Sequence, residues 1–149
     1  MRAVIQRVKS ASVSVDGSVT GKIGHGILIY LGVAIGDTEK DLDYIIKKTV
    51  DLRIFSDEDG KMNKSLRDVS GSVLLVSQFT LSGDARRGTR PSFSSAARPD
   101  EAEALYGEFK SRLAEMGIES GSGVFGADME VSSVNDGPVT IILDSTKLF

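Results

Sequence analysis

The stretch from Val73 to Leu81 (Val-Leu-Leu-Val-Ser-Gln-Phe-Thr-Leu) constrains the fold more than any other part of this sequence. It opens with an apolar, β-branched run, which is typical of a buried strand. Polar side chains then enter at Ser77, Gln78 and Thr80. If the strand continues, alternation places Ser77 and Phe79 on one face and the other two residues on the opposite face. Because loops on a rigid scaffold often carry function, this strand end is either a site or a simple cap of the sheet.

Several other parts of the sequence have the composition of short strands. Apolar and β-branched residues gather in seven further runs: residues 2–8, 11–15, 18–23, 27–34, 52–55, 129–134 and 139–143. Asp16-Gly17 is a strong two-residue hairpin turn between two of these runs. The run 27–34 is apolar on both faces, which indicates a central strand.

Two segments have the apolar stripe of a helix. Thr38 and Asp41 resemble a capping box at the start of the first segment. The second segment starts at Pro99 and stops at Gly117. Because the strands and the two helices do not alternate strictly, the sequence predicts a single α+β domain over residues 1–149, with a mixed or antiparallel sheet.

Composition excludes several kinds of chemistry. The chain has no cysteine, and its one histidine, His25, lies between two glycines in an expected turn. A zinc site would need His25 together with carboxylates alone, so no metal and no cofactor is predicted. The longest apolar run, residues 27–35, is too short to span a membrane. Arg2 and Arg7 interrupt the apolar N-terminal run, so no signal peptide is expected and the predicted location is cytoplasmic.

The charge distribution leaves room for a local contact with RNA. A formal net charge of −3 argues against a protein that coats nucleic acid generally. The segment between Asp84 and Asp100 nevertheless has no acidic residue. It contains four arginines: Arg86, Arg87, Arg90 and Arg98. Such a loop either contacts phosphates or is merely solvated. The predicted RNA contacts are Arg86, Arg87 and Arg90.

Five motifs together point to a known family. They are Met1–Val8, Ser77–Leu81, Arg90-Pro91-Ser92-Phe93, Gly123–Met129 and Asn135-Asp136-Gly137-Pro138-Val139-Thr140. With these motifs, the sequence resembles the D-aminoacyl-tRNA deacylase family over its whole length. The one departure is His25, at a turn position where proline is expected. The resemblance implies a homodimer whose sheets curve into a barrel-like core.

The resemblance also implies an activity. A member of this family hydrolyses the ester bond of D-aminoacyl-tRNA, releases the free amino acid and tRNA, and rejects L-aminoacyl-tRNA, which is quality control in translation. Gly137-Pro138, with a cis peptide bond, is implied to form the chirality filter and to reach into the partner's site. A rigid backbone there excludes one hand of the α-carbon by steric clash. Glycine has no side chain, so glycyl-tRNA should also pass the filter.

The residues expected to carry the reaction are Ser77, Gln78, Phe79 and Thr80, and their types leave two mechanisms open. In one mechanism Thr80 is the nucleophile, although the sequence offers no base to activate it. In the other, which we favour, backbone amides near Gln78 to Thr80 hold the carbonyl while water or the ribose hydroxyl reacts. Phe79 either packs on the 3′-terminal adenine or is a core residue.

Two other functional classes remain possible. One is a dimer that binds a small amino-acid-like or RNA ligand without turnover, which the missing general base favours. The other is a hydrolase of free D-amino-acid esters or amides. Release of amino acid from D-aminoacyl-tRNA, compared with the L-form and a free ester, separates the three.

Overall fold

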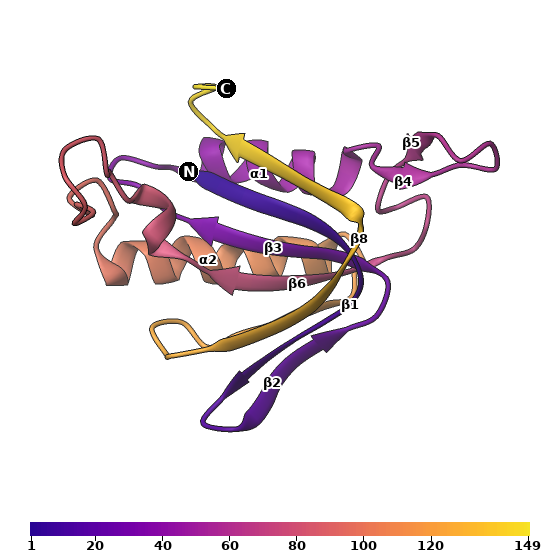
Figure 1. The fold of residues 1–149 in the computed structure, drawn as a ribbon, viewed down its shortest axis with the longest axis horizontal. Helices are drawn as coiled ribbons and strands as arrows, with labels where there is room; N and C mark the ends of the chain where they lie inside the picture. The colour runs from indigo at the N-terminus through magenta and orange to yellow at the C-terminus, as the bar shows by residue number, and fades with distance from the viewer.

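Strand β1 (Arg2–Val15) organises the sheet because it pairs along both of its edges. One edge pairs antiparallel with β2 (Ser18–Ile23) and β3 (Gly26–Gly32), which follow the turn at Asp16-Gly17. The other edge pairs antiparallel with the last strand, β8 (Glu130–Asp144). The computed structural model describes residues 1–149, and six of its strands form one strongly curved sheet (Figure 1).

The sheet becomes mixed beyond β3. Strand β6 (Ser72–Ser77) pairs parallel with β3, and β7 (Ser120–Ser122) pairs parallel with β6. The two crossovers contain helices α1 (Glu39–Asp51) and α2 (Pro99–Glu115), which pack on the same face of the sheet (Figure 1). The predicted α+β fold, with a mixed, barrel-like sheet and two helices, is confirmed. The homodimer stays a prediction.

A small second sheet stands apart from the main one. It consists of β4 (Phe55–Ser56) and β5 (Met62–Lys64), which pair antiparallel. The strand predicted over residues 52–55 is therefore shorter and starts later than expected. None of the helices is long and apolar enough to span a membrane.

Both faces of β3 are buried, as its composition predicts. Ile27 and Ile29 pack toward the helices, in a core that includes Leu42 from α1 and Phe109 from α2. Leu28 points the other way, into a smaller apolar cluster where β1 and β2 curl over β3 and β6. A strand can bury both faces in this way only at the centre of a layered fold, so the prediction of a central strand is confirmed.

Local sequence signals are reproduced closely. Asp16 and Gly17 have φ angles of 50° and 80°, as expected for a tight hairpin turn. At the start of α1 the Thr38 hydroxyl accepts a bond from the N–H of Lys40, and the Asp41 carboxylate accepts one of 2.8 Å from the N–H of Thr38. The φ angles confirm the hairpin turn, and the two hydrogen bonds confirm the capping box.

The predicted strand over residues 73–81 is wrong beyond Ser77. A 3-10 turn, η1 (Phe79–Ser82), follows instead. Because β3 ends here, the N–H of Gln78 makes the last ladder bond, 2.8 Å to the carbonyl of Leu31. Without a further partner the chain satisfies its polar groups by turning. The predicted alternation of the side chains that follow is therefore also wrong.

The strands predicted over residues 129–134 and 139–143 belong to the single strand β8. Its pairing with β1 shifts register between Asn135 and Thr140. Four residues of β8, 136–139, thus stand opposite the single residue Arg7. A bulge of this size bends the strand and carries the 136–139 segment out of the ladder.

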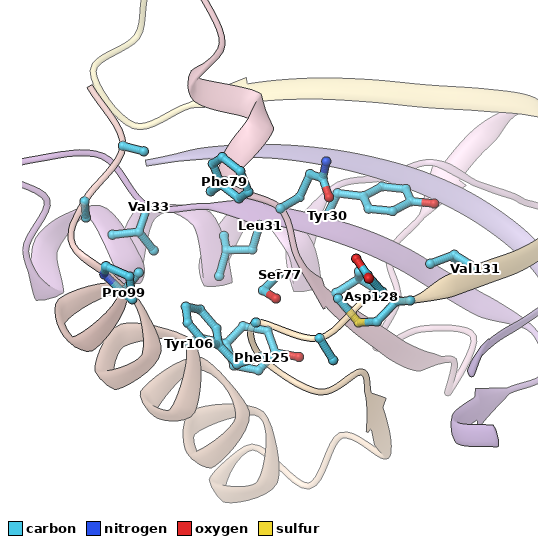
Figure 2. Close-up of a pocket in the computed structure, with 18 residues that line it drawn as sticks. Tyr30, Leu31, Val33, Ser77, Phe79, Pro99, Tyr106, Phe125, Asp128 and Val131 are labelled. Carbon is cyan, nitrogen blue, oxygen red and sulfur yellow. The ribbon is translucent and has the colours of Figure 1, made fainter. Parts of the chain in front are cut away.

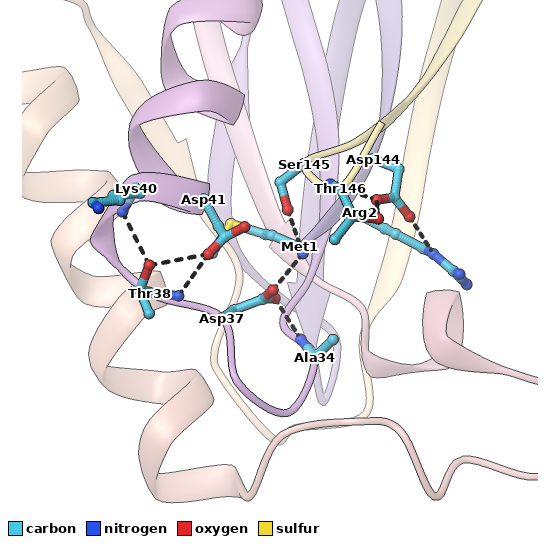
Figure 3. Close-up of polar contacts among 10 residues, drawn as sticks. All are labelled: Met1, Arg2, Ala34, Asp37, Thr38, Lys40, Asp41, Asp144, Ser145 and Thr146. Carbon is cyan, nitrogen blue, oxygen red and sulfur yellow. Dashed lines mark hydrogen bonds and ion pairs between the residues drawn. The ribbon is translucent and has the colours of Figure 1, made fainter. Parts of the chain in front are cut away.

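A partly buried polar network joins the beginning of β1 to the end of β8 (Figure 3). The amino group of Met1 lies 2.6 Å from one carboxylate oxygen of Asp37 and donates to the hydroxyl of Ser145 over 2.8 Å. The guanidinium of Arg2 donates to the Asp144 carboxylate over 2.9 Å. Burial alone would raise the pKa of Asp144, but hydrogen bonds from Thr146 and Arg2 outweigh it and lower the pKa.

The close spacing of neighbouring strands depends on two glycines. A Cβ atom at Gly26 would overlap the carbonyl oxygen of Ser72 on β6. A Cβ atom at Gly21 would lie 2.6 Å from the carbonyl oxygen of Ser122 on β7. Glycine therefore permits both the β3–β6 pairing and the approach of β2 to β7 that nearly closes the sheet.

Gly26→Ala is expected to lower the free energy of unfolding by about 1–3 kcal/mol, because the new methyl group forces β3 and β6 apart. Gly24→Ala is the matched control, since a Cβ atom there meets nothing within 4 Å. It should change stability by less than about 0.5 kcal/mol. Urea denaturation of both variants measures the difference, and equal stability would contradict the close-approach argument.

Candidate active site

A cavity of about 590 Å³ opens where β3 and β6 end. One wall comes from these strand ends, another from α2, and a third from the segment leading into β8. Most of the lining is apolar or aromatic, and its central members are Tyr30, Leu31, Ser77, Gln78, Phe79, Tyr106, Phe125, Asp128 and Met129. Figure 2 shows Ser77 between the ring of Phe79 and the rings of Tyr106 and Phe125. A concave, mostly apolar cavity with a few polar groups is the usual form of a small-molecule site.

Three of the four residues expected to carry chemistry line this cavity: Ser77, Gln78 and Phe79. Ser77 is the last residue of β6, and its hydroxyl makes no hydrogen bond within the chain. The exposed ring of Phe79, with 59% of its surface accessible, lies at the cavity rim. The alternative that Phe79 is a core residue is therefore wrong.

Thr80 does not line the cavity. Its hydroxyl accepts a hydrogen bond from the side-chain amide of Gln78. An amide N–H cannot take up a proton, so this partner cannot activate Thr80 as a base would. The only histidine, His25, packs edge-on against Phe55, with ring centroids 5.1 Å apart. Nowhere in residues 1–149 do three His, Cys, Asp or Glu side chains gather as a metal site would require.

Sequence reasoning missed the tyrosine at the cavity floor. Tyr106 belongs to the apolar stripe of the helix predicted to start at Pro99, yet its hydroxyl donates to the carbonyl of Leu75 over 3.0 Å. Burial raises the pKa of Tyr106 to about 12, so its phenol remains a neutral donor. The ring also contacts Phe125, with centroids 5.8 Å apart. For Phe125, the family motif Gly123–Met129 was the sequence signal that its segment belongs to the site.

The end of β3 allows η1 to lie directly on the sheet. A Cβ atom at Gly32 would come within 2.8 Å of the carbonyl oxygen of Gln78 and 3.1 Å of the Leu81 side chain. Arg2 holds the turn from another side, because its guanidinium donates to the carbonyl of Leu81 over 3.0 Å. Backbone contact and a side-chain hydrogen bond together fix where the residues of η1 stand.

Gly137 and Pro138 lie away from this cavity. Both are exposed, and the peptide bond between them is cis. Arg7 supports the segment from below, donating to the carbonyl of Asp136 over 3.1 Å and to that of Ile54 over 2.6 Å. Residues 136–139 are separated from Ser77 by three strand spacings, which is about 14 Å across the sheet. Along the strands the register places them four residues away, which is about 13 Å at the usual rise per residue. One chain therefore does not bring the two motifs together.

The arginine loop also differs from its expected form. Its ends are joined by two backbone hydrogen bonds between Asp84 and Ser92, of 2.8 and 2.9 Å. Arg86 makes a bidentate pair with Asp84, at 2.9 and 2.6 Å, which lowers the pKa of that carboxyl to about 2. Arg87 and Arg90 are exposed and have no acidic partner. Of the three arginines predicted to contact RNA, Arg87 and Arg90 are therefore the two whose positive charge is not paired with a carboxylate.

Comparison with known proteins gives a consistent result. A sequence profile described as D-Tyr-tRNA(Tyr) deacylase matches residues 4–144. Two proteins named D-aminoacyl-tRNA deacylase align over 100% of both chains: one from Alkaliphilus metalliredigens (strain QYMF) at 53% identity, and one from Thermosipho africanus (strain TCF52B) at 54%.

Solved structures agree with this result. One named "c-Myc DNA Unwinding Element Binding Protein" has a TM-score of 0.91 and 42% identity, covering 97% of this chain and 98% of its own. Another, described as a probable eukaryotic D-amino acid tRNA deacylase, has a TM-score of 0.79 at 18% identity, covers 95% of this chain and 97% of its own, and shares the fold. The full-length matches and the profile together show that this chain belongs to the D-Tyr-tRNA(Tyr) deacylase family.

Proposed function

We propose that this protein hydrolyses the ester bond between a D-amino acid and the 3′ end of tRNA. The observation that carries the proposal is the cavity lined by Ser77, Gln78 and Phe79, in a chain that matches deacylases over its full length. The exposed charges of Arg87 and Arg90 stand on the loop that follows η1 and suit the phosphates of an RNA partner. Because aminoacyl-tRNA is a cytoplasmic substrate, we expect the protein to act in the cytoplasm.

The reaction depends on positioning rather than on a strong base. The N–H groups of Phe79 and Thr80 begin η1, where such groups lack an acceptor within the turn. They can donate to the ester carbonyl oxygen as negative charge develops on it. Water, assisted by the neighbouring ribose hydroxyl, then attacks the carbonyl carbon. The bond to the esterified ribose oxygen breaks, that oxygen takes up the proton lost by the water, and the free amino acid leaves. An aminoacyl ester is already activated, so this arrangement needs no protein nucleophile.

The apolar lining suits the terminal adenosine. The exposed ring of Phe79 offers a face on which a base can stack, as aromatic side chains often do with unpaired nucleotides. Tyr106 and Phe125 give the cavity an aromatic floor. The adenine then lies within the cavity while the aminoacyl group extends toward Ser77 and the start of η1.

Gly137 and Pro138 act as the chirality filter across a homodimer interface. Three observations support this part of the proposal. Both residues are exposed and stand far from the cavity of their own chain. Val134 and Ile142, on the same strand, expose apolar side chains that an interface would cover. Gly137 has no side chain, so its backbone can approach the α-carbon of a substrate closely and exclude the L-form. Glycyl-tRNA passes such a filter.

A second candidate is binding of DNA. The solved relative at 42% identity is named for a DNA element, and the exposed arginine loop would suit any phosphate backbone. The net charge of −3 argues against it, because DNA-binding domains are usually basic. A competition experiment, in which duplex DNA is added to the protein bound to tRNA, measures how strongly the protein binds DNA relative to tRNA.

The first experiment compares the two hands of one substrate. D-tyrosyl-tRNA should lose its amino acid and L-tyrosyl-tRNA should persist, because the filter excludes the L α-carbon. Free D-tyrosine ethyl ester should react far more slowly, since it lacks the adenosine that fills the cavity. Amino acid release is followed by thin-layer chromatography. Equal turnover of both hands would contradict the filter, and preference for the free ester would favour the simpler esterase.

Thr80→Val tests the mechanism. Valine keeps the shape of threonine and removes only the hydroxyl, so activity should stay within about tenfold of the unmodified protein if backbone amides do the work. Loss of a true nucleophile costs on the order of 10⁴-fold or more. Thr20→Val, at an exposed residue of β2 that does not line the cavity, also removes one hydroxyl and its hydrogen bond, to the carbonyl of Val13, and controls for stability. An acyl group trapped on Thr80 would restore the nucleophile mechanism.

Gly137→Ala tests the filter. Gly137 has a φ of 122°, which strains any residue with a side chain, and a Cβ atom there would lie 2.9 Å from the Arg7 guanidinium, so either this backbone or the Arg7 side chain that supports it must shift. Displacement by about 1 Å can cost on the order of 10²-fold in rate, and D-tyrosyl-tRNA deacylation should fall accordingly. Gly17→Ala, with a φ of 80° and nothing within 4 Å, is the matched control for backbone strain. Full activity and full selectivity in Gly137→Ala would remove this residue from the filter.

A further inference from the structure

We infer that Phe93 is a positioning residue that holds the ring of Phe79 at the cavity rim. The inference rests on the proposed function and adds a residue outside the cavity to it. The two rings meet edge to face, with centroids 5.1 Å apart and planes at 70°. Aromatic pairs prefer this arrangement because the positive ring edge meets the negative ring face.

Phe79 needs such support because of where it stands. It is the first residue of η1, a turn of four residues, and 59% of its surface is accessible. A side chain so exposed has few neighbours to select one rotamer. A ring that must present one face to a base works best when that rotamer is already set, since ordering it on binding costs affinity. Phe93 is its aromatic partner.

Phe93 is itself fixed by the end of η1. A Cβ atom at Gly83 would lie 3.1 Å from the Phe93 ring, so the missing side chain lets the ring lie against the turn. The carbonyl of Phe93 accepts a bond of 3.0 Å from the N–H of Ala96. The hydroxyl of Ser95 donates to the carbonyl of Ser82 over 3.2 Å. The segment that carries Phe93 is thus tied to the turn that carries Phe79.

A second role for Phe93 must be separated from this one. Phe93 directly follows Ser92, which closes the arginine loop through its two bonds with Asp84. In this alternative role, Phe93 serves only to anchor the arginine loop and does not act on Phe79. The two roles differ in the substrate that reveals them. A loop anchor affects only substrates with a tRNA body, whereas a residue that positions Phe79 also affects an ester of adenosine alone.

The test measures KM and kcat for two substrates, D-tyrosyl-tRNA and 3′-O-(D-tyrosyl)adenosine. Phe93→Leu keeps apolar volume but removes the ring, so KM should rise about 3- to 10-fold for both substrates, the range for one aromatic pair, with kcat nearly unchanged. Phe93→Tyr keeps the ring and should restore KM. Phe149→Leu, which makes the same exchange at a more exposed phenylalanine, the last residue of the chain, should leave both constants unchanged.

A double variant completes the experiment. If Phe93 acts through Phe79, the change Phe93→Leu should add little to KM once Phe79→Leu is present, because contacting residues are not additive. Fully additive effects, or an effect of Phe93→Leu on the tRNA substrate alone, would overturn the inference. An active protein in which Phe93→Leu changes nothing overturns this inference and leaves the proposed function intact. A protein that releases no amino acid from either substrate overturns both.

Discussion

The parallel pairing of β3 with β6, and the point at which it ends, decides most of this structure. The ladder stops at Leu31 and Ser77, and one further bond, from the N–H of Gln78, closes it. Beyond that bond the backbone has no strand to pair with, so it satisfies its polar groups by folding into η1. The cavity lies at this edge, between the strand ends, α2 and the segment that leads into β8. In parallel sheets such an edge is a frequent place for ligands.

The structure also requires the backbones of neighbouring elements to approach one another closely. Gly26 lets β3 lie against β6, and Gly32 lets η1 lie on the end of β3. These contacts are steric and do not depend on pH or salt. Two ion pairs at the start of β1, the buried pair of Met1 with Asp37 and the partly buried pair of Arg2 with Asp144, then tie this edge to β8. Exposed pairs such as Arg86 with Asp84 shape a loop but contribute little to stability, because solvent screens them.

The chemistry that we propose follows from what these constraints place at the cavity. Hydrogen bonds in fixed positions are available from Ser77, Gln78 and the first N–H groups of η1. Thr80, the residue considered as a possible nucleophile, has only the side-chain amide of Gln78 as its hydrogen-bond partner. Such a site can stabilise charge and orient reactants but cannot remove a proton readily. An activated ester suits it better than an amide or a phosphate ester would. The same reasoning gives weight to Phe93, which we infer to hold the ring of Phe79 in place from outside the cavity.

The sequence by itself determined what depends on neighbours along the chain. The turn at Asp16-Gly17, the capping box at Thr38 and the helix from Pro99 were all predicted, because φ preference and capping act over a few residues. Only the tertiary structure decided where strand β6 ends, because that point depends on where β3 ends. It also decided that Tyr106 reaches the cavity floor and that Arg86 pairs with Asp84. These outcomes arise from contacts between residues distant in sequence or from side-chain geometry, and residue pattern carries no information about either.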